Sequence, residues 1–108
     1  MKAVVITTDG CISVEQVRKG LQAKRKIVSG DIECITLDRD FKMQMFINEA
    51  GKLEHRPINE MATSVYRSYF VADDWIAGNA LICGVDSEGA SCDLTEEQIK
   101  EIKEKANV

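Results

Sequence analysis

Two pairs of apolar, β-branched runs constrain the fold of this chain more than any other feature of its sequence. Lys2–Thr7 and Cys11–Val14 flank the dipeptide Asp9-Gly10, which is a strong signal for a tight hairpin turn. Residues 31–37 and 41–47 both alternate apolar and polar side chains, and a short polar turn separates them. The sequence therefore predicts two antiparallel hairpins.

The remaining segments carry helix signals and one further strand signal. Apolar positions within Val17–Val28 fit a helical stripe, and Asn59 stands where the N-cap of a second helix is needed. Residues 75–85 form a strongly apolar run that predicts a strand. Thr95 and Gln98 predict a capping box at the start of a C-terminal helix.

These segments define the expected architecture. We predict a single α+β domain over residues 1–108. Its sheet is mainly antiparallel, with about five strands, and two to three helices pack on one face.

Composition removes several classes of function. The chain has 108 residues, a mass of 12.0 kDa, a formal net charge of −4 and an isoelectric point near 5.0. This acidic balance argues against duplex nucleic acid as a partner, because such binding usually needs a basic surface. No apolar stretch is long enough to span a membrane, and the short run after Met1 does not fit a signal peptide. We therefore expect a cytoplasmic protein.

The cysteines and the histidine form no pattern typical of a metal site or of catalysis. The four cysteines include no C-x-x-C pair, and His55 is the only histidine, so we expect reduced thiols, no metal and no cofactor. As a general base, His55 would need an oriented partner, and the sequence contains no P-loop, G-x-S-x-G or H-E-x-x-H motif. We therefore expect no enzymatic activity. A small hydrolase centred on His55 is the alternative.

One stretch around the second helix combines the residue types that a nucleotide ligand requires. Asn59, Thr63 and Arg67 recur at intervals of four residues, so they share one face of the predicted helix. Aromatic rings can stack on a base, and an arginine can bind a phosphate with two hydrogen bonds. The candidate ligand-binding residues are Arg56, Asn59, Thr63, Tyr66, Arg67 and Trp75. The same residues would also serve as the edge of a core and a helix cap.

Two charged segments leave further alternatives open. The segment 18–26 carries five cations, which form either a phosphate-binding stripe or an ordinary solvated face. The C-terminal helix carries Glu96, Glu97, Glu101 and Glu104. Those carboxylates form either a solvated face or an acidic surface that a partner protein binds.

Five segments carry a family resemblance. They are Val28–Glu33, Phe46–Leu53, Pro57–Thr63, Trp75–Leu81 and the Asp86–Gly89 turn. In this order and spacing, the chain resembles the small proteins of domain of unknown function 3846. The resemblance implies an origin in phages, plasmids or other mobile elements, and it implies no particular chemistry.

The sequence thus leads to two hypotheses of function. The first is a non-enzymatic accessory protein of phage or mobile-element origin that acts by binding, in counter-defence, by sequestering a small anionic nucleotide. The second is a protein–protein interaction module that blocks a host protein through its acidic helix or an exposed sheet edge. A homodimer is a further expectation, because a symmetric interface can build a pocket from two copies of one segment.

Overall fold

Six strands form one antiparallel sheet in the computed structural model, which describes residues 1–107. The strands are Lys2–Ile6 (β1), Ile12–Gln16 (β2), Ile32–Thr36 (β3), Met43–Asn48 (β4), Ala80–Val85 (β5) and Ser91–Cys92 (β6). Their order is β2-β1-β5-β4-β3, and β6 pairs with the last residues of β5. The predicted α+β class, the antiparallel sheet and both hairpins are confirmed.

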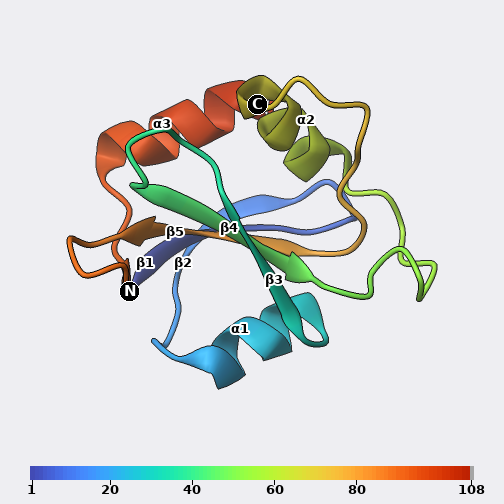
Figure 1. The fold of residues 1–108 in the computed structure, drawn as a ribbon, viewed down its shortest axis with the longest axis horizontal. Coiled ribbons are helices and arrows are strands. Elements are labelled where there is room, and N and C mark those ends of the chain that lie inside the picture. The colour runs from blue at the N-terminus through green and yellow to red at the C-terminus, as the bar shows by residue number, and fades with distance from the viewer. Residues whose placement is uncertain (108) are drawn as a thin grey trace.

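Within residues 1–107, three helices cover the two faces of this sheet. They are Leu21–Val28 (α1), Glu60–Tyr69 (α2) and Glu96–Lys105 (α3). Figure 1 shows α2 and α3 on one side of the sheet and α1 on the other. Two helices therefore share one face, as predicted, and the third lies opposite them.

Both faces need a helical cover because the central strands are apolar at successive positions. In β1, Val4 and Ile6 pack in the larger core with α2 and α3, whereas Ala3 and Val5 pack in a smaller core under α1. All four are buried. Because successive side chains of a strand point to opposite faces, such a strand buries one set of side chains on each side.

The first helix is shorter than the sequence predicts. Val17 N–H donates to the Met1 carbonyl at 2.8 Å, so the chain stays extended beyond β2 and Val17 enters the smaller core. Gly20 follows with a φ of 111°, and the helix begins only at Leu21. Of the five cations predicted to lie on this helix, the two at positions 18 and 19 precede it.

The predicted strand over residues 75–85 is also shorter, and it begins at Ala80. Gly78 has a φ of 89°, which breaks the extended backbone at that point. The residues before it pair with another segment instead, through a single bridge between Ile58 and Ala77. The two-residue strand β6 was not predicted, because so short a run carries no periodic pattern.

Both predicted helix caps are confirmed. Asn59 is the N-cap of α2, and its Oδ1 accepts a hydrogen bond from Ala62 N–H at 3.0 Å. Thr95 and Gln98 form the capping box of α3, with hydrogen bonds in both directions. Residues 94 and 99, which flank that cap, are both buried in the larger core.

The Asn59 side chain does more than cap a helix. It is only 1% exposed, and its Nδ2 donates to the carbonyls of Ile6 at 2.9 Å and Gly78 at 3.0 Å. This amide therefore joins the end of β1, the chain before β5 and the start of α2. A backbone hydrogen bond from Asn59 N–H to the Ile76 carbonyl (2.8 Å) reinforces the same junction.

Gly84 marks a close contact between backbones. It pairs with Met43 on one side and Cys92 on the other. A Cβ atom at this position would lie 2.5 Å from the carbonyl oxygen of Asp93. Asp93 directly follows Cys92, so its oxygen cannot move away without disturbing the pairing of β6 with β5.

Among residues 1–107, no helix is long and apolar enough to cross a membrane.

Replacing Asn59 with alanine should strongly destabilise the fold. The change removes the α2 cap and leaves the two carbonyls it serves without donors, so we expect a loss of about 2–4 kcal/mol. Urea unfolding followed by circular dichroism measures this loss. The neighbouring exposed change Glu60→Gln is the matched control and should shift stability by less than about 0.5 kcal/mol. Equal effects of the two changes would contradict the role given to Asn59.

Replacing Gly84 with alanine should also destabilise the sheet, since the added methyl group meets a backbone oxygen. Overpacking of this kind costs about 1–3 kcal/mol. Ser87→Ala, in the exposed turn that follows, serves as the control with little expected change. A Gly84→Ala protein as stable as the control would show that the close contact relaxes at no cost.

Candidate functional site

The six candidate ligand-binding residues do not line one pocket. Asn59 and Thr63 are buried, and their polar atoms are used within the fold. Asn59 makes the three side-chain bonds described above, and Thr63 Oγ1 accepts from Ile76 N–H at 2.9 Å. These two residues position the helix and the chain beside it.

The two arginines point to different places. Arg56 Nε donates to Glu54 Oε1 at 2.8 Å, and its Nη2 donates to the Ser29 carbonyl at 3.3 Å. Arg67 donates to the carbonyls of Asp74 at 3.0 Å and Asp73 at 3.2 Å. Each guanidinium group therefore braces a loop, and the two do not converge on a common phosphate position.

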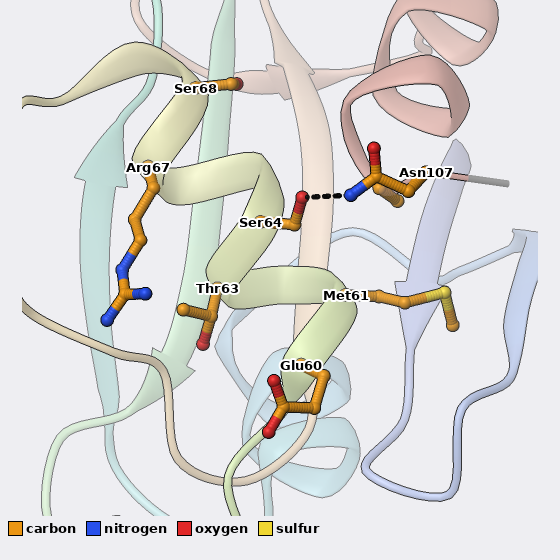
Figure 2. Close-up of a pocket in the computed structure, with 8 residues that line it drawn as sticks. Glu60, Met61, Thr63, Ser64, Arg67, Ser68 and Asn107 are labelled. Carbon is orange, nitrogen blue, oxygen red and sulfur yellow. Dashed lines mark hydrogen bonds between the residues drawn. The ribbon is translucent and has the colours of Figure 1, made fainter.

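The outer side of α2 carries a shallow polar hollow of about 520 Å³, drawn in Figure 2. Ser64 Oγ donates to the Lys105 carbonyl at 2.7 Å and accepts from Asn107 Nδ2 at 2.9 Å. Figure 2 shows the Arg67 side chain on one side of α2 and the Ser64–Asn107 hydrogen bond on the other. The hollow is therefore a seam between α2 and the end of α3, where the polar groups satisfy one another.

A second and more enclosed cavity contains the other two candidate residues, Tyr66 and Trp75. Its volume is about 430 Å³, and it lies between α2, the β3–β4 pair and the chain before β5. We call it the aromatic cleft. Its lining residues are Glu33, Ile35, Ile47, Asn48, Glu49, Lys52, Leu53, Tyr66, Phe70 and residues 74–77.

The walls of the aromatic cleft expose large apolar groups. Tyr66 and Phe70 stack with ring centroids 4.9 Å apart and an interplanar angle of 26°. Trp75 is 42% exposed and Leu53 is 84% exposed. Apolar side chains of this size scattered singly on a surface need no explanation, but several around one cavity are typical of an interaction site.

The charges of the aromatic cleft are mostly negative. Among the described residues, the acidic residues Glu33, Glu49 and Asp74 line it, and Lys52 is the one basic residue of the lining. Lys52 hydrogen bonds to Asp74, and its Nζ lies 4.2 Å from the centroid of the Trp75 ring. The hydrogen bond from Lys52 holds the pKa of the Asp74 carboxyl below its ordinary value.

One rim of the aromatic cleft belongs to β3, the last strand of the sheet. Leu37 N–H donates to the Met43 carbonyl at 3.0 Å, which sets the phase of the β3–β4 ladder. Because antiparallel hydrogen bonds fall on alternate residues, the backbone groups of Ile32, Cys34 and Thr36 point away from β4. Within residues 1–107, no other strand pairs with that edge.

The charged segments noted in the sequence are partly engaged elsewhere. Lys24 lies 4.2 Å above the Phe46 ring and donates to Ser91 Oγ at 2.8 Å. Arg25 forms an ion pair with Asp31 at 3.3 Å, which interrupts the predicted cationic stripe. In α3, Glu96 pairs with Lys2 and Glu101 accepts from the Tyr69 hydroxyl, leaving Glu97 and Glu104 exposed.

His55 lies in an exposed turn with a φ of 55°. Its neighbour Glu54 accepts hydrogen bonds from Arg56 and Asn48 instead. Among the described residues, His55 has no side-chain hydrogen bond, and no three His, Cys, Asp or Glu side chains group as metal ligands do. The geometry needed for a histidine base is therefore not built around His55.

Sequence reasoning missed much of the aromatic cleft. Phe70 lies one helical turn after Tyr66, and that spacing is a signal that could have identified it. Glu33 and Ile35 come from a strand more than thirty residues earlier in the chain. Only the pairing of β3 with β4 brings them to α2, so no local pattern indicates their place in the site.

A comparison with protein families matches residues 1–107 to a family model described as domain of unknown function (DUF3846). No curated protein and no solved structure matches the chain. Since the match spans nearly the whole chain, the protein belongs to the DUF3846 family.

Proposed function

We propose that this protein is a non-enzymatic binding module that recognises an extended segment of a partner protein. The observation that carries the proposal is an exposed edge strand, β3, bordering a cleft lined by Tyr66, Phe70 and Trp75. A segment added to a sheet edge gains affinity from main-chain hydrogen bonds, and pockets for alternate side chains add specificity.

The two parts of this surface are arranged to act together. Glu33 and Ile35 alternate with the residues whose backbone groups point outward, and both side chains line the aromatic cleft. A strand bound to β3 would place every second side chain on the same face of the sheet. The partner's backbone would thus meet the edge while its side chains enter the aromatic cleft.

The phage or mobile-element setting implied by the family resemblance belongs to the same proposal. In that setting, the module would act in the cytoplasm as a counter-defence protein that blocks a host protein. The edge of β3 suits this task better than α3, because Glu96 and Glu101 of α3 are already engaged within the chain.

Capture of a small anionic nucleotide is the second candidate function. The stacked rings of Tyr66 and Phe70, which are partly exposed, favour it, since nucleobases stack on accessible aromatic rings. The acidic lining of the aromatic cleft opposes it, and both arginines proposed for the phosphate are occupied by loop contacts. We therefore place it below recognition of a protein segment.

Selection from a displayed library of random peptides tests the leading proposal. We expect the selected peptides to perturb the backbone amide signals of β3 in nuclear magnetic resonance spectra. Cys34→Pro removes an outward N–H from the middle of β3, so it should weaken binding by more than about tenfold. Cys34→Val keeps that N–H and is the matched control. Leu53→Ser should weaken binding by roughly tenfold through lost apolar contact.

Three results would count against this proposal. Peptides whose affinity is unchanged by Cys34→Pro would not bind by strand addition. Analytical ultracentrifugation could reveal a homodimer that Cys34→Pro disrupts and Cys34→Val does not. Such a dimer would pair through β3, and a second copy of this chain would then occupy the edge. Thermal stabilisation by mono-, di- or cyclic nucleotides that is lost in Arg56→Ala or Arg67→Ala would favour the second candidate.

A further inference from the structure

We infer that the aromatic cleft takes a cationic side chain, a lysine or an arginine, from the partner segment that pairs with β3. The inference rests on the proposed function and names the chemistry of the residue that enters the cleft. It follows from the register of β3, the charges around the cleft and the position of Lys52.

The register of β3 determines which partner side chains reach the aromatic cleft. An antiparallel partner strand would hydrogen bond to the backbone of Ile32, Cys34 and Thr36. The partner residues that lie opposite Glu33 and Ile35 would then form non-hydrogen-bonded pairs with them, in which side chains lie closest. These partner residues face the same side of the sheet as Glu33 and Ile35, which is the side of the cleft. A long side chain entering there passes Ile35 and meets the rings of α2.

The chemistry of the aromatic cleft suits a cation with an apolar stem. The faces of aromatic rings attract ammonium and guanidinium groups, and Tyr66, Phe70 and Trp75 supply such rings. Three acidic residues and one lysine line the cleft, and the Arg67 guanidinium lies beside it on the Asp74 carbonyl. The acids still outnumber the cations, so an arriving cation meets an excess of negative charge. The apolar stem of lysine or arginine can lie along Ile35 and Leu53 while its head reaches the acids.

Lys52 already makes, within the chain, the contacts that we infer for the partner. Its ammonium hydrogen bonds to Asp74 and lies over the ring of Trp75. A cationic partner side chain would share this acid and this ring with Lys52. Lys52 therefore competes with a cationic ligand, whereas it would assist an anionic one.

Because Lys52 competes with a cationic ligand, removing its charge should tighten the binding of such a ligand. The probes are three extended-peptide libraries whose central residue is fixed as lysine, methionine or glutamate. We expect peptides with lysine to be enriched, and replacing that lysine with methionine should weaken binding by about tenfold. The variant Lys52→Gln should bind the lysine peptides about three- to tenfold more tightly than the unchanged protein.

Lys100→Gln is the matched control, because it makes the same charge change at an exposed position of α3. It should leave the affinity for lysine peptides almost unchanged. Two results would overturn the inference and leave the proposed function standing. One is equal enrichment of the three libraries among peptides that bind at β3. The other is weaker binding of lysine peptides to the Lys52→Gln variant than to the unchanged protein. Preferential binding of the glutamate library would assign the aromatic cleft to anions and overturn it as well. Failure of all three libraries to bind would overturn the inference and the proposed function together.

Discussion

The buried amide of Asn59 holds three distant parts of the chain together. Its two donated hydrogen bonds satisfy carbonyls of Ile6 and Gly78, and its oxygen caps α2. These groups come from three separate parts of the chain and lie where water cannot reach them. A buried carbonyl without a donor is costly, so all three parts must meet at this one side chain. The amide thereby sets where α2 begins on the sheet.

The aromatic cleft is built outward from this junction. Thr63 binds Ile76 N–H, and Arg67 holds the carbonyls of Asp73 and Asp74, so α2 secures the loop that carries Trp75. On the other side, a Cβ at Gly51 would lie 2.6 Å from the Ala77 carbonyl oxygen, so the turn that bears Lys52 approaches the same loop closely. A scaffold held by so many backbone contacts can leave several apolar side chains exposed without loss of order.

Charge separates the two kinds of ligand more clearly than shape does. Aromatic rings accept either a base or a cation, and a cavity of about 430 Å³ has room for small groups of both kinds. Phosphate needs converging donors, whereas the arginines of this region donate to carbonyls and to Glu54. Among the described residues, the carboxylates of Glu33 and Glu49 form no ion pair, whereas Asp74 would share its charge between Lys52 and an arriving cation. Electrostatic complementarity of this kind mainly sets specificity and the rate of association.

The elements with local signals can be predicted from the sequence. The Asp9-Gly10 turn, the alternation in β3 and β4, the Asn59 cap and the Thr95–Gln98 capping box each act within a few residues of chain. Such signals are legible because turn and cap energies depend on neighbouring residues. The sequence also identified Tyr66 and Trp75 as candidate residues, and both line the aromatic cleft.

The roles of the candidate residues depend on the packing of the whole chain. The composition around α2 was compatible with a ligand site and with a helix cap. Both side chains are buried, and their bonds assign Asn59 to the cap and Thr63 to the chain before β5. The placement of α1 opposite the other helices, the pairing of residues 76–77 with the chain before α2, and the presence of Glu33 beside Tyr66 all depend on contacts between distant segments. The physical reason is that a side chain's role depends on which groups compete for its hydrogen bonds and on whether water reaches it. Both are properties of the packed chain and not of its local pattern.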